Sequence, residues 1–129
     1  MNIGQAAARS GLLAKTIRYY EDVALAPAPA RTASGYRDYS DRDVHILRFI
    51  HAARGLGFTV EECRELVALY TDPERSSANV KAIAATKIEA IDAKLAELRA
   101  MRATLAELAA KCHGDDRPDC PILDRLAQG

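Results

Sequence analysis

The stretch NIGQAAARSGLLAKTIRYYEDVAL, residues 2–25, contains two short amphipathic segments separated by a turn at Gly11. The first predicts a helix that ends at Ser10 and Gly11 and has a small apolar inner face, made of Ile3, Ala6 and Ala7. The second predicts a helix with inward positions at i, i+4 and i+7: Leu13, Ile17 and Tyr20. Its opposite face carries Lys15, Arg18 and Tyr19. Two short helices joined by a tight turn, the second with basic residues outward, indicate a helix-turn-helix.

The next segment, APAPARTASGYRDYS at residues 26–40, cannot form a regular helix because it contains two prolines and a glycine. We expect a β-hairpin, or wing, that turns near Ser34 and Gly35. Ser40 then predicts the N-cap of a helix that ends at Gly55 to Gly57. The residues TVEE form a capping box in which Thr59 and Glu62 begin another helix, running to about Tyr70.

Residues 77–111 contain neither Pro nor Gly. Apolar residues recur along them at helical spacing: Ala84, Ile88, Ile91, Leu95, Leu98, Met101, Leu105 and Leu108. A helix of this length would be about 50 Å long at 1.5 Å per residue, which is more than the rest of a small chain can cover. The apolar stripe therefore predicts a partner helix, and a second copy of this chain is the simplest source. The alternative is that the stripe packs on the chain's own N-terminal domain.

The charge of the chain is unevenly distributed, although the formal net charge is zero. Residues 1–58 carry a net charge of +3 and residues 59–129 a net charge of −3. Seven of the eight basic residues of the first part are interleaved with Tyr19, Tyr20, Tyr36 and Tyr39. They are Lys15, Arg18, Arg31, Arg37, Arg42, Arg48 and Arg54. Such side chains bind phosphates and read base edges, so this set favours DNA binding over an ordinary solvated face.

Other function classes have little support in the sequence. The three histidines lie in no catalytic or zinc-protease motif, and no glycine-rich phosphate loop follows a strand, so we expect no enzyme activity. The N-terminus lacks the apolar region of a signal peptide, and no run approaches the length of a membrane span. These features predict a cytoplasmic protein without membrane contact.

The segment AKCHGDDRPDCPIL, residues 110–123, holds two of the three cysteines, Cys112 and Cys120. Two thiolates suit a soft monovalent ion that accepts two ligands, whereas zinc usually requires four. A disulfide is also sterically possible, but a cytosolic location disfavours it. The spacing alone leaves these alternatives open. Cys63 lies among apolar residues and is expected to be a buried structural thiol.

Five segments of the chain together resemble the MerR family of transcriptional regulators, and within it the copper efflux regulators. They are TIRYYE at 16–21, SGYRDY at 34–39, RGLGFTVEE at 54–62, DPERSS at 72–77 and CHGDDRPDCPI at 112–122. The resemblance implies a mainly α-helical fold: a winged helix-turn-helix DNA-binding domain at 1–70, a linker at 71–76, an antiparallel coiled-coil dimerisation helix at 77–111, and a metal-binding loop with the C-terminal tail at 112–129.

The resemblance also implies that Cys112 and Cys120 bind Cu(I), with Ag(I) or Au(I) as mimics. Ser77 occupies the position at which sensors of zinc and other divalent ions carry a cysteine. A serine there withholds a third thiolate, which would favour a monovalent ion. The structural alternative for Ser77 is a helix N-cap. One departure from the family pattern is Leu13, which stands where relatives often have a Ser or Thr cap.

The function implied is a copper(I)-responsive activator that binds double-stranded promoter DNA as a homodimer. When metal is bound, it would distort the promoter so that RNA polymerase can transcribe copper efflux or detoxification genes. The residues expected at the DNA are Lys15, Arg18, Tyr20, Arg31, Tyr36, Arg37 and Arg54. Two alternatives remain at this point: a MerR-type sensor of zinc or another divalent ion, and a cytosolic copper-buffering protein.

Overall fold

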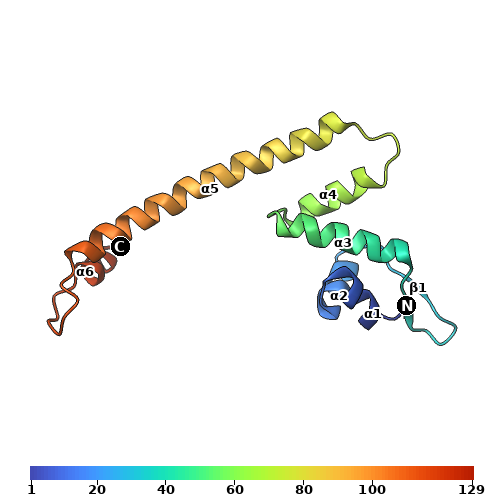
Figure 1. Cartoon of the computed structure of the whole chain (residues 1–129), viewed down its shortest axis with the longest axis horizontal. Coiled ribbons are helices and arrows are strands. Elements are labelled where there is room, and N and C mark those ends of the chain that lie inside the picture. Colours follow the sequence, from blue (N-terminus) through green and yellow to red (C-terminus); the bar gives the residue numbers. More distant parts are fainter. The chain divides into compact units, whose positions relative to one another are not determined.

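The computed structural model describes residues 1–129 and is mainly helical. Its elements in chain order are α1 (Ile3–Ser10), α2 (Ala14–Asp22), β1 (Ala30–Arg31), β2 (Arg37–Asp38), α3 (Asp41–Gly55), α4 (Val60–Tyr70), α5 (Ser77–Lys111) and α6 (Pro121–Gln128). The chain divides into two compact units, Met1–Ile83 and Ala84–Gly129, and the division falls within α5 (Figure 1).

Helices α1 and α2 form the predicted helix-turn-helix. Asn2 and Gln5 cap α1 reciprocally, since each side chain accepts a hydrogen bond from the other's backbone N–H, at 2.8 and 2.9 Å. Gly11 ends the helix with φ of 79°, a left-handed conformation that favours glycine. A Cβ at this position would also lie 3.3 Å from the His51 ring of α3. The turn therefore needs glycine both for its backbone and for close packing.

The start of α2 differs from the prediction in one respect. The sequence pattern predicts an inward Leu13, but its side chain is 74% exposed, and Leu12 is the buried residue. Leu13 is the N-cap and has an extended backbone, with φ of −74° and ψ of 146°, so it does not lie on the helical face that begins at Ala14. No side chain caps α2. Ile17 and Tyr20 point inward as predicted.

The wing is a two-stranded antiparallel hairpin in which Ala30 pairs with Asp38 and Arg31 with Arg37. Its turn is closed by two backbone hydrogen bonds, from the Thr32 N–H to the Tyr36 carbonyl and from the Gly35 N–H to the Thr32 carbonyl, at 2.8 and 2.9 Å. These bonds confirm the predicted hairpin near Ser34 and Gly35. The strand after the turn leads directly into α3.

The core of the first unit lies among α1 to α4. Ser40 and Thr59 are the N-caps of α3 and α4, as predicted. Thr59 forms the predicted capping box with Glu62, and Ser40 also forms one, with Asp43. The buried residues are Ala6, Leu12, Ile17, Tyr20, Leu25, Ala26, Tyr39, Val44, Ile46, Leu47, Ile50, Ala53 and Cys63. Cys63 is fully buried, which confirms the expectation of a structural thiol. Arg64 of α4 donates a hydrogen bond to the Val23 carbonyl at the C-terminal end of α2, at 2.5 Å.

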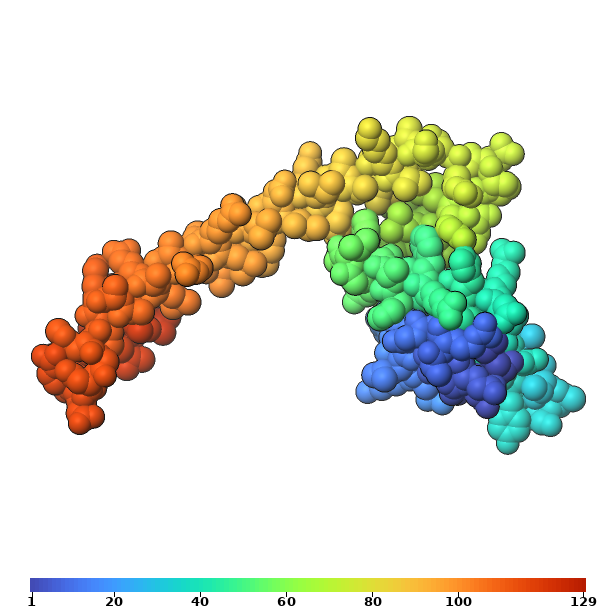
Figure 2. Space-filling view, in the orientation of Figure 1, coloured from blue at the N-terminus to red at the C-terminus, as the bar shows by residue number.

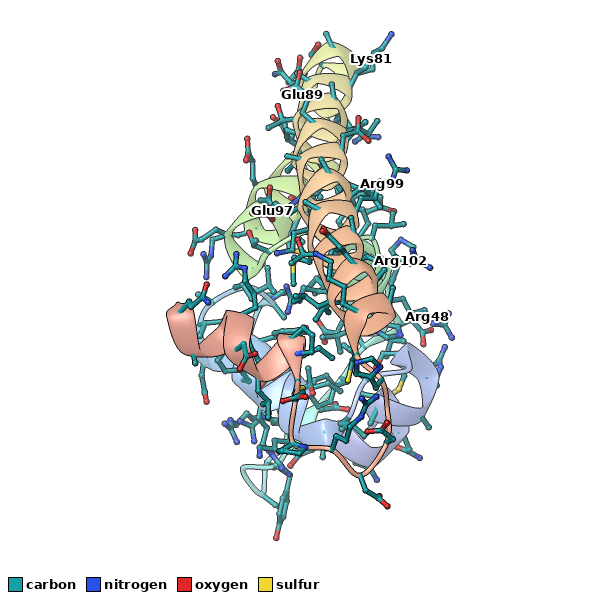
Figure 3. The ribbon with its side chains drawn as sticks, turned by 90° about the vertical axis from the view of Figure 1, so that its left-hand side faces the viewer. Arg48, Lys81, Glu89, Glu97, Arg99 and Arg102 are labelled. Atoms are coloured by element: carbon teal, nitrogen blue, oxygen red, sulfur yellow. The ribbon has the colours of Figure 1, made fainter.

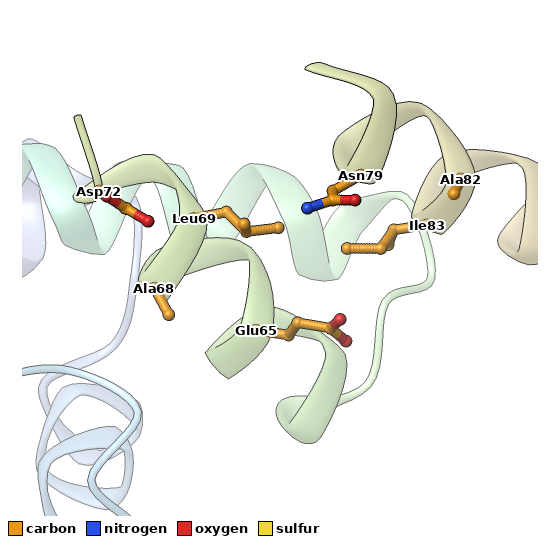
Figure 4. Close-up of a pocket in the computed structure, with 7 residues that line it drawn as sticks. All are labelled: Glu65, Ala68, Leu69, Asp72, Asn79, Ala82 and Ile83. Atoms are coloured by element: carbon orange, nitrogen blue, oxygen red, sulfur yellow. The ribbon is translucent and has the colours of Figure 1, made fainter. Parts of the chain in front are cut away.

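A shallow groove separates α4 from the first two turns of α5 within this unit (Figure 4). Its volume is about 440 Å³, and it is lined by Glu65, Ala68, Leu69, Asp72, Asn79, Ala82 and Ile83. Leu69 and Ile83 extend toward each other across it in the close-up (Figure 4). The first turns of α5 belong to the same compact unit as α4.

The second unit consists of most of α5, a loop and α6. Helix α5 has no buried residue along its 35 residues, and its apolar stripe is open to solvent. Figure 2 shows this helix as a narrow rod, on whose visible face no other segment of the unit lies before the loop and α6. The labelled charged side chains of α5, among them Glu97, Arg99 and Arg102, extend outward from the ribbon (Figure 3). No helix of the structure combines the length and the apolar character that crossing a bilayer requires.

Candidate nucleic-acid interface and candidate metal centre

The outer face of α2 presents basic and aromatic side chains to solvent. Lys15 and Arg18 are exposed, and Tyr19 is 51% exposed. They lie on the face opposite Ile17, which is fully buried in the core. The rigid packing of Ile17 therefore fixes the orientation of the exposed face, as a DNA-reading helix requires.

A cleft of about 190 Å³ lies between the start of α1, the outer face of α2 and the wing. It is lined by Asn2, Ile3, Arg18, Arg31, Gly35, Tyr36 and Arg37. Arg31 donates a hydrogen bond to the Gly35 carbonyl across the hairpin turn, at 2.9 Å, and Tyr36 is 74% exposed. The structure thus brings together four residues predicted to contact DNA, namely Arg18, Arg31, Tyr36 and Arg37.

Arg37 is anchored to α2 by Glu21, the last residue of the motif TIRYYE, to which the sequence analysis assigns no role. The Arg37 Nε donates to Glu21 at 2.9 Å, and the other oxygen of Glu21 accepts the Tyr39 hydroxyl at 2.5 Å. The Glu21 side chain is only 7% exposed. Glu21 follows the buried Ile17 at i+4, and this spacing is the signal that could have identified it as an inward-facing residue.

Tyr39 is buried in the core, whereas the sequence pattern groups it with the tyrosines of the basic surface. Burial and the neighbouring Glu21 carboxylate together raise the pKa of the Tyr39 hydroxyl far above its ordinary value. The hydroxyl therefore stays protonated and acts as a hydrogen-bond donor. Tyr39 lies where the wing meets the core, away from solvent.

Two further residues predicted to contact DNA lie apart from the cleft. Tyr20 is 6% exposed and packs in the core, with its ring 5.9 Å from that of Tyr19. This burial contradicts the surface position that a contact with DNA requires, so we omit Tyr20 from the interface. Arg54 is exposed near the end of α3 and donates to the Phe58 carbonyl at 2.9 Å.

The second candidate site is the loop between α5 and α6, which has a cysteine at each end. Cys112 directly follows α5, and its N–H bonds to the Ala109 carbonyl at 3.2 Å. Cys120 is the N-cap residue of α6, and its carbonyl accepts the Asp124 N–H at 3.0 Å. Both thiols are free and half-buried. Each cysteine is therefore fixed to a helix end, while the residues between them form an irregular loop.

The loop is shaped by its own polar contacts. Asp115 accepts hydrogen bonds from the Arg117 backbone N–H and from the Arg117 Nε, both at 2.9 Å. Gly114 has a φ of 69°, which allows the chain to leave the end of α5 sharply. Asp115 and Arg117 thus pair with each other within the loop.

The donor set of this loop suits a soft ion with few ligands. Within one chain, no group of three or more His, Cys, Asp or Glu side chains is placed to hold a metal ion. A structural zinc site usually has four such ligands, of which the two cysteines would supply two. Two thiolates match the preference of Cu(I) and related monovalent ions for sulfur. The residues present therefore fit a soft metal ion.

Ser77 is the first residue of α5, and the cap is its neighbour Ser76. The Ser76 hydroxyl accepts the Ala78 N–H at 3.2 Å, and its carbonyl accepts the Asn79 N–H, also at 3.2 Å. The capping role considered as the alternative for Ser77 is therefore filled by Ser76. Capping does not explain a serine at position 77, whose side chain is exposed.

The fold and the exposed faces define a winged helix-turn-helix protein whose DNA-binding unit is followed by a long helix and a cysteine-bearing loop. The family model described as "MerR HTH family regulatory protein" matches residues 1–69, and the model described as "MerR, DNA binding" matches residues 44–108. The chain belongs to the MerR family of transcription regulators, as its sequence motifs predicted.

Similar proteins cover the whole chain. The HTH-type transcriptional regulator HmrR of Rhizobium leguminosarum bv. viciae is 59% identical, with 100% of this chain and 99% of that protein aligned. The HTH-type transcriptional regulator CueR of Salmonella typhimurium is 44% identical, over 98% of this chain and 92% of its own length. The crystal structure of the transcription regulator PbrR691 from Ralstonia metallidurans CH34 in complex with lead(II) is 32% identical, with a TM-score of 0.85 and 98% of each chain covered.

These similarities establish the general function. The chain is a metal-responsive transcription regulator of a family that binds promoter DNA, and its relatives are named as regulators, not as enzymes. The prediction of a non-enzymatic DNA-binding regulator is confirmed at this level.

Proposed function

We propose that this chain is a copper(I)-responsive activator that binds promoter DNA as a homodimer and switches on copper efflux or detoxification genes. The observation that carries this proposal is the pair of free, half-buried thiols at the ends of the α5–α6 loop, with no third metal ligand grouped beside them in the chain. A site with two thiolates leaves a monovalent ion with a small net charge, whereas a divalent ion would lack ligands.

Ser77 supports the choice of a monovalent ion. Because Ser76 caps α5, the residue at position 77 is not needed as the N-cap. A cysteine at position 77 could therefore serve as an additional thiolate. In our proposal, Ser77 keeps the site at two sulfurs and so selects Cu(I), with Ag(I) and Au(I) as mimics. Bound Cu(I) would supply a link between Cys112 and Cys120, which ties the end of α5 to the start of α6.

The dimer is proposed from the apolar stripe of α5. Ile88, Ile91, Leu95, Leu98, Met101 and Leu105 are between 42% and 58% exposed in the single chain. Leaving this many large apolar side chains in water is unfavourable, and an antiparallel coiled coil with a second α5 would bury them. Such a dimer would present two α2 helices to an inverted repeat in DNA.

At the DNA, the proposed roles follow the exposed side chains. Lys15 and Arg18 of α2 enter the major groove, and the phosphate contacts come from Arg31, Tyr36, Arg37 and Arg54. We propose that the metal-loaded dimer bends and untwists the promoter spacer so that RNA polymerase can use it. Deforming DNA in this way costs on the order of a few kcal/mol, which protein–DNA contacts can offset.

Cysteine substitutions test the sensor function. Changing Cys112 or Cys120 to Ser should abolish the transcriptional response to copper while leaving promoter affinity nearly unchanged, because neither thiol lies in the DNA-binding unit. The matched control is Cys63→Ala, which removes the buried core thiol and should keep the copper response. Loss of DNA binding in parallel with loss of Cys112 or Cys120 would contradict the sensor model.

Metal selectivity and base reading have separate tests. A Ser77→Cys variant should extend the response toward divalent ions, and an unchanged metal profile would remove Ser77 from the selectivity argument. That test also addresses the alternative of a zinc-type sensor. Replacing Arg18 by Ala should weaken specific DNA binding by roughly 1 to 3 kcal/mol if Arg18 reads a base. A copper-buffering protein would show no such dependence on a helix-turn-helix arginine.

A further inference from the structure

The cleft between the wing and α2 has the charge and size of a site for one phosphodiester group. Among its lining residues are three guanidinium groups, those of Arg18, Arg31 and Arg37, and no carboxylate. Arg31 and Arg37 face each other across the hairpin, since they are paired residues of β1 and β2. A volume of about 190 Å³ is sufficient for a phosphate with its bridging oxygens.

Arg37 differs from the other two arginines because its guanidinium is held by a buried partner. Its Nε donates to Glu21 at 2.9 Å, and its side chain is 28% exposed. A guanidinium carries five N–H donors in a planar fork, and the Nε uses one of them. The remaining donors of Arg37 stay available to an anion in the cleft while the bond to Glu21 fixes the plane of the group.

Glu21 also connects α2 to the wing at a second point. Its second oxygen accepts the hydroxyl of Tyr39, one residue beyond β2, at 2.5 Å. Both oxygens of a carboxylate that is 7% exposed are therefore bonded to side chains of the strand segment 37–39. If one member of the buried Arg37–Glu21 pair moved away, the charge of the other would be uncompensated. The two side chains are therefore held in a fixed arrangement.

We infer that Glu21 is a positioning residue for DNA binding. It anchors Arg37, and through Tyr39 the second wing strand, so that Arg31 and Arg37 bind one backbone phosphate beside Arg18 of the recognition helix. This inference rests on the proposed DNA-binding role of these arginines, and it adds an acidic residue that promotes binding to a polyanion. Glu21 itself touches no DNA in this arrangement.

The sign of the effect distinguishes positioning from simple electrostatics. A carboxylate near DNA repels phosphates, so its neutralisation should strengthen binding if Glu21 acts only through its charge. If Glu21 positions Arg37, the Glu21→Gln variant should bind DNA more weakly, because the guanidinium loses its fixed orientation. Asp22 provides the matched control, since it is the next residue of α2 and is exposed. Asp22→Asn should leave the affinity unchanged or raise it.

The experiment measures the binding of the full-length protein to a mixed-sequence DNA duplex by fluorescence anisotropy over a series of salt concentrations. Such binding depends on phosphate contacts and not on base reading. For Glu21→Gln, we expect weaker binding and a log–log salt slope smaller by about 0.9 for each phosphate that a protomer no longer neutralises. Circular dichroism would verify that each variant is folded.

A double substitution tests whether Glu21 acts through Arg37. Arg37→Gln alone should reduce the slope by the same amount, and adding Glu21→Gln to it should reduce neither the slope nor the affinity further. Binding by Glu21→Gln that is as tight as wild type, or tighter, would overturn the inference, as would additive losses in the double variant. If the wild-type protein fails to bind the duplex, the proposed DNA-binding function fails instead.

A variant of the partner keeps the inference testable if Glu21→Gln does not fold. Arg37→Lys retains the positive charge, but an ammonium group lacks the planar fork that serves Glu21 and a phosphate together. We expect this variant to show the same smaller salt slope as Arg37→Gln. A slope equal to that of the wild type would show that charge alone suffices and would contradict the positioning role.

Discussion

The two units of this chain differ in how they bury apolar side chains. The unit of residues 1–83 has a core in which Ile17, Val44, Ile50 and Cys63 are almost fully excluded from water. The unit of residues 84–129 has regular helices but no buried residue in either α5 or α6. The first unit can therefore be stabilised by its own contacts, whereas the second leaves the apolar stripe of α5 exposed, and we propose that a second copy of the chain covers it. Four substitutions test this difference, beginning with the largest expected effect.

Shortening one residue of the α5 stripe should strongly weaken the proposed dimer. Leu98 occurs twice in a homodimer, and burying a leucine side chain is worth about 1.5 to 3 kcal/mol. We expect Leu98→Ala to raise the dimer dissociation constant at least about 100-fold, because the two losses add. Analytical ultracentrifugation measures this constant. The control is Arg99→Ala, whose charged side chain extends outward from the same turn (Figure 3), and an equal effect of both substitutions would refute the stripe as the interface.

A core substitution in the first unit should destabilise folding without this dependence on a partner. Ile50 is fully buried, and its replacement by Ala should lower the free energy of unfolding by about 2 to 5 kcal/mol. Leu13→Ala serves as the control, because Leu13 is 74% exposed and its loss should have little effect. Urea denaturation followed by circular dichroism compares them. Similar losses for both variants would mean that the first unit lacks the core described here.

The cap of α5 should depend on Ser76 and not on Ser77. Removing a serine N-cap typically costs about 0.5 to 2 kcal/mol, so Ser76→Ala should reduce the thermal stability of α5. Ser77→Ala should leave it nearly unchanged, because position 77 lies inside the helix. Thermal melts of the two variants, recorded at equal protein concentration, measure this difference in stability. A larger loss of thermal stability for Ser77→Ala would show that Ser77, and not Ser76, caps the helix.

The smallest effect concerns pH and the first unit alone. The pKa of Tyr39 is raised in the folded state, so the native protein retains a proton that the unfolded chain releases above about pH 10. The stabilisation from the hydrogen bond between the Tyr39 hydroxyl and Glu21 is fully present below about pH 10 and declines as the pH rises. Tyr39→Phe should flatten the decline in unfolding free energy at alkaline pH. An identical pH dependence in the two proteins would show that Tyr39 does not contribute to it.

The sequence predicted local structure well wherever a single residue type decides it. The turn at Gly11, the N-cap at Ser40, the capping box at Thr59 and the uninterrupted helix from Ser77 to Lys111 all occur as expected. Each depends on side chains only a few residues apart. The inward face of α2 was wrongly extended to Leu13, because no polar cap marks the beginning of that helix.

The candidate sites were predicted only in part, because their geometry depends on residues far apart in the chain. The arginines and tyrosines were identified by type, but their separation into an exposed set and the buried Tyr20 and Tyr39 depends on tertiary packing. The bond from Arg37 to Glu21 spans 16 positions and leaves no local pattern. For Cys112 and Cys120 the sequence supplied two candidate ligands, and their binding of metal is our proposal.

The central claim is that Cys112 and Cys120 hold a monovalent soft metal with two sulfurs. X-ray absorption spectroscopy of Cu(I) bound to the purified protein, together with the metal-to-protein ratio, tests it most directly. We predict one Cu(I) for each pair of cysteines and a first shell that contains only two sulfur atoms. A shell with three or four ligands, or tight binding that persists in a Cys112→Ser, Cys120→Ser double variant, would contradict it.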